Sequence, residues 1–285
     1  MSSNGSSRIA ASAVLTLVLV LCAACGSSAD DGASTNGTAP TTTTPAKPPA
    51  AGPQSNDAAY CKAALAIDTA PGPQIDFATA SEAEVASGLK AYAADTLGPL
   101  LDDIERVAPA ELADAVATYR KAIDQVAATG DASAFDDPAV DQAGASAHAY
   151  DLKTCGYEQV DAVATDYAFG GISQDYESGP VSFEVSNEGK ELHEMVVLRV
   201  KDGVDQSASE ILALPEEEAS ALVETVGSMD PLAPGDSDYL VVDLQPGRYI
   251  ATCFLPKGAT SMDTMQSAEG EPHAALGMVQ EFTVA

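Results

Sequence analysis

The apolar residues follow a helical period between residues 57 and 157. Steps of three and four separate the members of two stripes, which are Val85, Leu89, Tyr92, Leu100, Leu101, Ile104 and Val107, and then Leu112, Val116, Tyr119, Ile123 and Val126. This spacing places each set on one helix face, so the helices are expected to pack by these faces. Pro109 and Gly130 flank the second stripe, as expected of helix boundaries. With shorter helices over residues 57–67 and 138–152, the pattern predicts a small bundle of three or four helices.

After residue 157 the period changes to two. Val181, Phe183 and Val185 alternate with polar residues, and further strand-like segments lie at residues 193–200, 239–244, 248–254 and 278–284. Short strands separated by Gly and Pro turns predict a β-sandwich. Pro215 and the acidic run after it predict a helical insertion over residues 207–226. The chain is therefore expected to be an α+β multidomain protein, with a helical bundle over residues 57–158 and a β-sandwich over residues 159–285.

The first 24 residues have the pattern of an export signal. Arg8 is their one charged residue, and an apolar run over residues 13–21 is followed by small residues before Cys25. This run is shorter than the roughly 20 apolar residues that a membrane-spanning helix needs. Ala23-Ala24-Cys25 resembles the lipobox of bacterial lipoproteins, although Cys22 stands where that box usually has Leu. The resemblance implies a lipid on Cys25 that anchors the protein on the extracytoplasmic face of the cell membrane. An ordinary signal peptide, cut nearby to release a free protein, is the alternative.

Residues 25–56 are dominated by Ser, Thr, Ala, Gly and Pro. A segment of this composition cannot bury enough apolar surface to offset the entropy lost on ordering. We therefore expect a flexible stalk that holds the folded part away from the membrane.

The chain is strongly acidic, with 43 Asp and Glu against 13 Lys and Arg and a formal net charge of −30. Such a charge is repelled by phosphate backbones, so nucleic acid is excluded as a partner. The acids are spread along the chain, which favours a role in solubility. A docking surface for a basic partner, or a collector of cations, is the alternative.

Three of the five cysteines remain once Cys22 and Cys25 are assigned to the signal and the lipid. An oxidising compartment favours one disulfide and leaves one thiol to be explained. Cys61 lies on the first predicted helix and Cys155 just after the last, so this pair would close nearly the whole bundle. A bond from Cys253 to either of them is the alternative, but it would leave a bundle cysteine unpaired.

Two of the three histidines lie in the predicted sandwich together with the remaining thiol. His193 begins a predicted strand, Cys253 ends another, and His273 and Met278 lie just before and at the start of the last. Two imidazoles, a thiolate and a weak axial thioether form the blue-copper donor set, which suits both oxidation states of copper. His148, in the predicted bundle, is expected to be a surface or helix-end residue.

The surrounding residues resemble a known family. Residues 187–193 resemble the plastocyanin-type turn that delivers the first His ligand, and Leu244-Gln245-Pro246-Gly247-Arg248-Tyr249, followed by Cys253, is similar to the strand that leads to the Cys ligand. The step from His273 to Met278 is also that of plastocyanin. Over about residues 160–285 the chain therefore resembles the cupredoxins. The resemblance implies a Greek-key β-sandwich with one type 1 copper site near one end, and a role in electron transfer.

The chain departs from this family at two places. Residues 254–272 separate Cys253 from His273, where cupredoxins usually have only a few residues. This loop, with Met262 and Met265, would either cap the site or indicate that it has degenerated. Glu194 stands where plastocyanin has an amide residue, and its carboxylate would steady His193 or shift the potential.

These observations favour a membrane-tethered copper protein that carries single electrons, with His193, Cys253, His273 and Met278 as ligands and a redox or copper-handling protein as partner. The alternatives are a metal-free scaffold lipoprotein, in which Cys253 is a small buried residue, and a copper carrier. The sequence does not favour an enzyme. It has no second histidine set for a multicopper oxidase, no second His four residues after His193 and no Gly-x-Ser-x-Gly elbow.

Overall fold

The structure is a computed structural model that describes residues 55–77, 79–265 and 267–285. The predicted signal peptide, Cys25 and residues 26–54 of the predicted stalk lie outside the described residues. The first helix begins at Ser55, two residues inside the predicted stalk. None of the described helices combines the length and the hydrophobicity that a membrane span requires.

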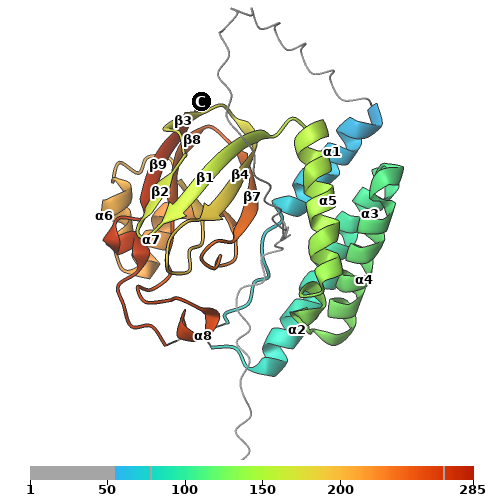
Figure 1. The fold of residues 1–285 in the computed structure, drawn as a ribbon, viewed down its shortest axis with the longest axis horizontal. Coiled ribbons are helices and arrows are strands. Elements are labelled where there is room, and N and C mark those ends of the chain that lie inside the picture. The colour runs from blue at the N-terminus through green and yellow to red at the C-terminus, as the bar shows by residue number, and fades with distance from the viewer. Residues whose placement is uncertain (1–54, 78, 266) are drawn as a thin grey trace, which may run out of the picture.

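Five α-helices form one layer of the molecule beside the sandwich (Figure 1). They are α1 (Ser55–Asp68), α2 (Glu82–Tyr92), α3 (Gly98–Val107), α4 (Ala113–Thr129) and α5 (Pro138–Thr154). The expected count of three or four was too low because the first apolar stripe is divided. A π-helical turn, η1 (Ala93–Leu97), joins α2 to α3. Such a turn rotates the helix face. Leu97 is consequently buried, while Leu100 is only half-buried.

The boundaries of α4 follow the predicted signals. Pro109 precedes a short 3-10 turn, η2 (Ala110–Leu112), that leads into the helix. Gly130 ends it with φ of 73°, and a Cβ at this position would lie 2.3 Å from the carbonyl oxygen of Ala86. Only glycine therefore permits the close approach of α2 and the end of α4.

The predicted disulfide between Cys61 and Cys155 is present and closes a segment of 94 residues. Cross-linking a loop of about 100 residues stabilises a fold by about 4.7 kcal/mol in the chain-entropy model, through the entropy of the unfolded chain. Cys253 is a free, buried cysteine. The alternative bonds from Cys253 to the bundle are therefore excluded.

The C-terminal part is a sandwich of two sheets, as predicted. One sheet has the strand order β2-β1-β4-β7 and the other β3-β9-β8-β5-β6. The chain passes from one sheet to the other after β2, β3, β4, β6 and β7, as in a Greek key. The strands are β1 (Glu158–Thr165), β2 (Ala168–Gly170), β3 (Asp175–Tyr176), β4 (Gly179–Asn187), β5 (Val196–Val200), β6 (Val223–Ser228), β7 (Ser237–Leu244), β8 (Gly247–Thr252) and β9 (Val279–Val284).

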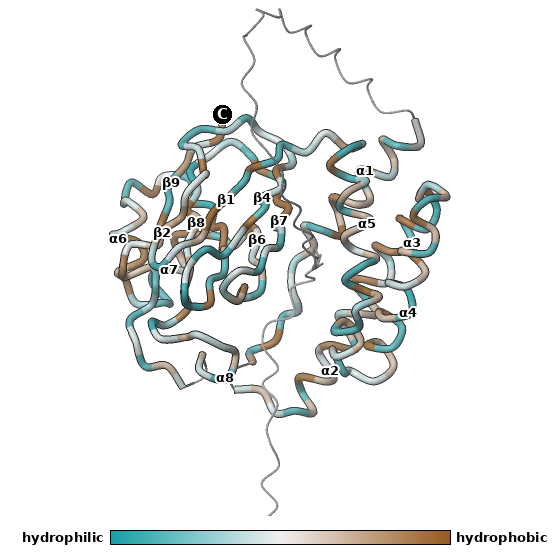
Figure 2. Tube along the Cα trace, viewed as in Figure 1, coloured by the Kyte–Doolittle hydropathy of each residue, from teal (hydrophilic) through white to brown (hydrophobic). Residues whose placement is uncertain are grey.

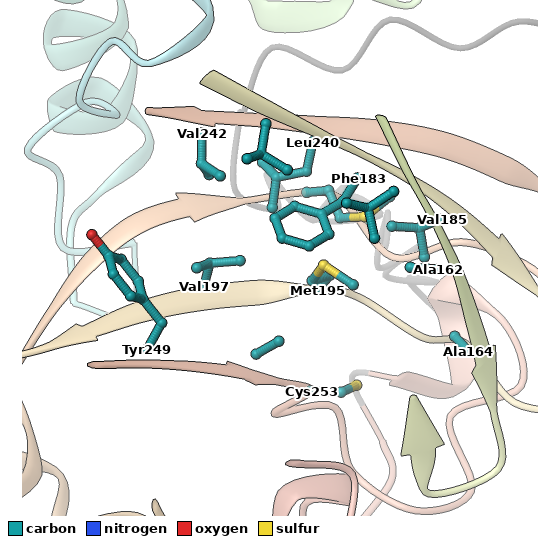
Figure 3. Packing of buried hydrophobic residues seen from close by; sticks show 14 of the residues in the cluster. Ala162, Ala164, Phe183, Val185, Met195, Val197, Leu240, Val242, Tyr249 and Cys253 are labelled. Carbon is teal, nitrogen blue, oxygen red and sulfur yellow. The ribbon is translucent and has the colours of Figure 1, made fainter. Parts of the chain in front are cut away.

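The core of the sandwich fills the space between the sheets. Hydrophobic and hydrophilic positions alternate along the strands (Figure 2). On β4, Val181, Phe183 and Val185 are buried, as their spacing predicts. Phe183 packs with Met195 in this core, and Cys253 lies at its edge (Figure 3). Cys253 and Met278 are thus part of the core of the sandwich.

Two sequence predictions in this domain need correction. The strand expected over residues 193–200 begins only at Val196, because His193 belongs to an isolated bridge with Leu232. The insertion expected to be helical through residue 226 contains α6 (Ala208–Leu212) and α7 (Glu216–Leu222) and then becomes β6, which pairs with β5. The pairing partner, which is distant in sequence, overrides the local helical pattern.

His148 is also not where the sequence suggested. It is 8% exposed and lies on α5 where the bundle meets the sandwich. Its Nε2 atom is 2.8 Å from Oε1 of Glu184 on β4, and its ring stacks on Tyr239 of β7 with centroids 3.4 Å apart. The bundle therefore packs on the outer face of the four-stranded sheet.

Candidate metal centre

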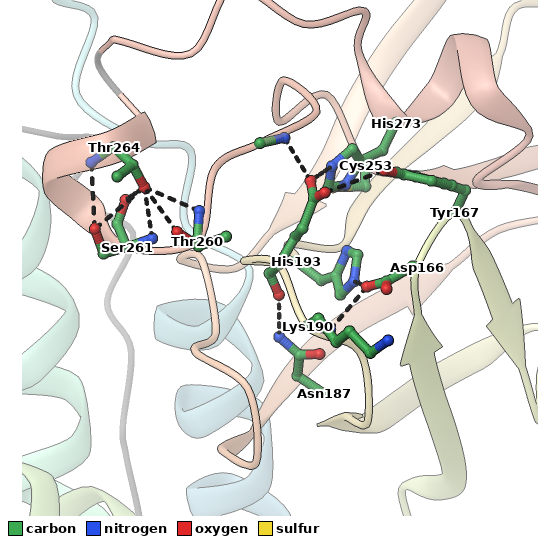
Figure 4. Close-up of polar contacts among 12 residues, drawn as sticks. Asp166, Tyr167, Asn187, Lys190, His193, Cys253, Thr260, Ser261, Thr264 and His273 are labelled. Atoms are coloured by element: carbon green, nitrogen blue, oxygen red, sulfur yellow. Dashed lines mark hydrogen bonds and ion pairs between the residues drawn. The ribbon is translucent and has the colours of Figure 1, made fainter.

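Three separate segments bring His193, Cys253 and His273 to one end of the sandwich (Figure 4). His193 is held by two backbone hydrogen bonds with Leu232, in which His193 N donates at 3.2 Å and Leu232 N donates at 2.7 Å. Cys253 follows β8 directly, and β8 pairs with β5 through Val196 and Thr252. His193 and Cys253 therefore lie at the same ends of neighbouring strands.

The long loop before His273 folds back on itself. Residues 256 and 272 form an antiparallel bridge, Lys257 N donates to the carbonyl of Glu271 at 2.9 Å, and His273 N donates to the carbonyl of Leu255 at 2.9 Å. We call this pairing of residues 255–257 with 271–273 the loop neck. The neck holds the two ends of the loop together, so that Cys253 and His273 lie as close in space as on a short ligand loop. We call the described residues between the two sides of the neck, 258–265 and 267–270, the excursion. The sequence left open whether this loop caps the site or marks its degeneration, and the loop leaves Cys253 and His273 together in one cluster.

The candidate ligand atoms are close together and buried. The nearest side-chain nitrogens of His193 and His273 and the sulfur of Cys253 all lie within 4.8 Å of one another, and all three residues are 0% exposed. Sγ of Cys253 is 3.4 Å from Nδ1 of His273, and the two imidazole centroids are 5.0 Å apart. Met278, one residue before β9, is fully buried, and its amide donates to the carbonyl of His273 at 3.0 Å. Its backbone is thus fixed beside the ligand helix η4 (His273–Leu276).

The ring of His193 shows that these residues fit a metal ion. Both of its nitrogens are buried without a hydrogen-bond partner among the described residues. Oδ1 of Asp166 lies 3.5 Å from Nε2, an ion-pair distance if the ring is protonated but longer than an ordinary hydrogen bond. Burial, followed by the neighbouring His273, lowers the pKa of His193, which favours the neutral imidazole that metals bind. A buried polar atom without a partner is costly, and coordination through one ring nitrogen removes that cost for the atom that binds the ion.

Two imidazoles and one thiolate in a buried site match copper best among the common metals. The two-sheet β domain and its His-Cys-His cluster agree with what the resemblance to the cupredoxins implied. Among solved structures, this domain is similar to a reduced auracyanin from the photosynthetic bacterium Roseiflexus castenholzii, with 19% identity over 45% of this chain and 96% of that one and a TM-score of 0.29.

A reduced rusticyanin is 18% identical, covering 45% of this chain and 76% of that one with a TM-score of 0.27. A multicopper oxidase from Pediococcus acidilactici is 13% identical over 45% of this chain and 26% of that one, with a TM-score of 0.26. No protein-family model matches the chain, and no curated protein matches it in sequence.

A carboxylate holds the outer nitrogen of His273. Oε2 of Glu191 is 3.0 Å from Nε2 of His273 and accepts the amide of Gly258 at 2.7 Å. The hydroxyl of Tyr167 donates to Oε1 at 3.1 Å, and its ring packs edge-on against His273. Burial alone would raise the pKa of Glu191, but the hydrogen bonds outweigh burial and lower this pKa. Glu191 is therefore an anion that orients His273 with Nδ1 toward the sulfur.

The turn that carries His193 is fixed by two polar side chains. Nδ2 of Asn187 donates to the carbonyls of Glu191 at 2.9 Å and Leu232 at 2.8 Å. Asp166 accepts the amide of Lys190 at 2.8 Å, and this hydrogen bond lowers the pKa of its carboxyl. The turn was predicted from the sequence, but the roles of Asp166, Tyr167 and Glu191 were not. Glu191 lies two residues before a predicted ligand, while Asp166 and Tyr167, in the turn between β1 and β2, gave no sequence signal.

Glu194 was expected to act on His193, but it contacts the segment that follows Cys253. Its Oε1 accepts the amide of Phe254 at 3.0 Å, so it braces the chain just after Cys253. Burial raises its pKa to about 6. Of the two loop methionines, Met262 in α8 (Met262–Met265) is 45% exposed and Met265 packs against the sandwich core. Just before this helix, the amides of Thr260 and Ser261 donate to Oγ1 of Thr264 at 2.9 and 2.8 Å (Figure 4).

We predict that Cys253 is unreactive in the folded, metal-free protein. Burial and then the charge of Glu194 raise the pKa of its thiol to about 12, so at pH 8 the fraction present as reactive thiolate is very small. Ellman's reagent at pH 8 should react slowly with Cys253 in the native protein and quickly after denaturation. After denaturation, the number of reacting thiols should be larger by one than in Cys253→Ser. Fast reaction of the native protein that Cys253→Ser abolishes would contradict the buried position.

Proposed function

We propose that this protein is a membrane-tethered, extracytoplasmic carrier of single electrons, in which His193, Cys253 and His273 hold one copper ion and Met278 supplies a weak axial contact. The observation that carries the proposal is the convergence of three buried donor atoms within 4.8 Å of one another. When bound, copper in such a donor set supplies a Cu(II)/Cu(I) couple.

The residues of the site are suited to electron transfer because they are already in place. Backbone hydrogen bonds fix His193 to Leu232, and the loop neck fixes His273 beside Cys253. A site that needs little rearrangement between oxidation states allows fast electron exchange. Metal binding also removes the proton of the Cys253 thiol, because a coordinated thiol is deprotonated.

The alternatives explain less of the geometry. A metal-free scaffold leaves both ring nitrogens of His193 buried without partners, whereas a bound copper ion would be the partner of one of them. A copper carrier has to release its ion, yet all three ligand residues are 0% exposed. An enzyme needs a position open to substrate, which a closed and buried ligand set does not offer. We therefore propose a carrier and not an enzyme, with a redox or copper-handling protein as partner.

The tether is a separate part of the proposal. It is supported by the lipobox-like Ala23-Ala24-Cys25 and by the Ser, Thr and Pro-rich segment that follows. Together these would hold the copper domain at the outer face of the membrane.

The visible spectrum tests the copper site. The purified protein with one equivalent of Cu(II) should develop an intense thiolate-to-copper band because Cys253 supplies the sulfur. Cys253→Ser should remove this band, whereas His148→Gln, which alters the histidine outside the cluster, should retain it. A colourless protein that fails to bind Cu(II) would contradict the proposal.

The reduction potential tests the role of Glu191. An anion on the outer nitrogen of His273 raises the basicity of the ligand and favours Cu(II). Glu191→Gln keeps the size of the side chain and its oxygen acceptor but removes the charge, so the reduction potential of copper should rise. Each tenfold loss in the preference for Cu(II) over Cu(I) corresponds to a rise of about 60 mV. Glu188→Gln makes the same change of net charge at an exposed position in the same turn and should leave the potential nearly unchanged. Equal shifts in the two variants would show that only overall charge matters.

A further inference from the structure

A cavity of about 560 Å³ lies between the helical bundle and the sandwich. Helices α1 to α5 and the segment between α1 and α2 line one side of it, and strands β6 and β7 line the other. Figure 1 shows α1 and α5 on the bundle side and β7 on the sandwich side of the boundary between the two layers. This volume is within the range of about 300 to 1,000 Å³ that is typical of small-molecule sites, and domain boundaries are a common place for them.

The walls of the cavity are mainly apolar and rich in aromatic rings. Aliphatic side chains such as Leu101, Ile104 and Val226 contribute, and five aromatic residues line the space. These are Tyr60, Phe77, Tyr92, Tyr119 and Tyr239. Such a surface favours a ligand with an apolar body, and the faces of aromatic rings also attract cations.

The charges that line the cavity are all negative. Asp68 ends α1 and Asp151 lies on α5, where it is 4% exposed, while Glu224 and Asp243 line the cavity from exposed positions on the strands. No Lys, Arg or His is among the described residues that line it. The acids therefore have no cationic side chain in the cavity to balance them.

Two tyrosine hydroxyls add an independent observation. Tyr119, which is 9% exposed, and Tyr239 both line the cavity, and both hydroxyl oxygens are buried without a hydrogen-bond partner among the described residues. Hydroxyl oxygens have lone pairs that accept hydrogen bonds as well as a proton to donate. An ammonium group only donates hydrogen bonds, and both carboxylate and hydroxyl oxygens accept them, so it fits a site that contains both.

The pKa shifts of Asp68 and Asp151 agree with a site for a cation. Burial, and then the charge of Asp151, raises the pKa of Asp68 well above its usual value, and burial raises the pKa of Asp151 to about 7. Their anionic forms are thus costly in the ligand-free protein, and a cation beside them would offset that cost.

We propose that the cavity between the bundle and the sandwich is a binding site for an organic cation, a protonated amine with an apolar body. The apolar and aromatic walls hold the body, and Asp68 and Asp151 hold the ammonium group, with the hydroxyls of Tyr119 and Tyr239 as further acceptors. The site is separate from the ligands of the copper centre, and this inference does not depend on metal binding.

Three probes of one shape test the charge preference. These are 4-phenylbutylammonium, 4-phenylbutan-1-ol and 4-phenylbutyrate, each titrated calorimetrically into the purified full-length protein. The ammonium should bind about tenfold or more tighter than the alcohol, since one charge-assisted contact of about 1.4 kcal/mol corresponds to tenfold in affinity. The carboxylate should not bind. Equal affinities for the three probes, or no binding of the ammonium at millimolar concentration, would overturn the proposal.

Variants locate the site. Asp151→Asn should weaken binding of the ammonium about tenfold, and Asp68→Asn serves as a second variant should the first not fold. Asp124→Asn removes the same charge from an exposed position on α4 outside the cavity and should leave the affinity unchanged. Thermal unfolding confirms that each variant is folded. Loss of affinity in Asp124→Asn equal to that in Asp151→Asn would contradict the site, because it would assign the binding to overall charge.

Discussion

The metal centre depends on the loop neck, the antiparallel pairing of residues 255–257 with residues 271–273. Nineteen residues separate Cys253 from His273 in the sequence, yet the neck places Sγ of the first 3.4 Å from Nδ1 of the second. Gly270 permits this closure, since a Cβ at that position would lie 2.3 Å from the carbonyl oxygen of Lys257. The excursion is also anchored to the first ligand segment, because the amide of Leu192 donates to the carbonyl of Ala259 at 2.6 Å. All three ligand segments are therefore joined by backbone hydrogen bonds.

Around this frame, acidic side chains set the electrostatics of the site. Glu191 bonds to the outer nitrogen of His273, Asp166 lies beside the outer nitrogen of His193, and Glu194 braces the chain after Cys253. In the metal-free protein the two imidazoles and the thiol are next to these acids in a buried place, which costs free energy. A cation at the centre offsets that cost. The same arrangement that destabilises the metal-free site thus favours the metal-bound one, and it favours the more highly charged oxidation state.

Much of this fold could be predicted from periodicity alone. Helical spacing gave the face of α4, alternation gave β4, and cysteine arithmetic gave the bond between Cys61 and Cys155. The missing parts depend on contacts between distant residues. Strand β1 alternates only small Ala residues with polar ones over much of its length, and β6 is a strand because it pairs with β5. At the site, ligand chemistry identified the histidines and Cys253. Glu194 was noticed only because it follows His193. Asp166 and Glu191 could not be found, because the sequence has 43 acidic residues and does not show which of them the fold brings to the site.

The bundle and the sandwich meet along a face where His148 stacks on Tyr239, beside the cavity, while the copper candidates lie at the end of the sandwich. We propose that the imidazoles of His193 and His273 and the thiolate of Cys253 bind a single copper ion. X-ray absorption at the copper edge of the loaded protein tests it most directly. We expect one short bond to sulfur and two bonds to imidazole nitrogen for each copper. A first shell of nitrogen and oxygen alone, with no sulfur, would contradict the account.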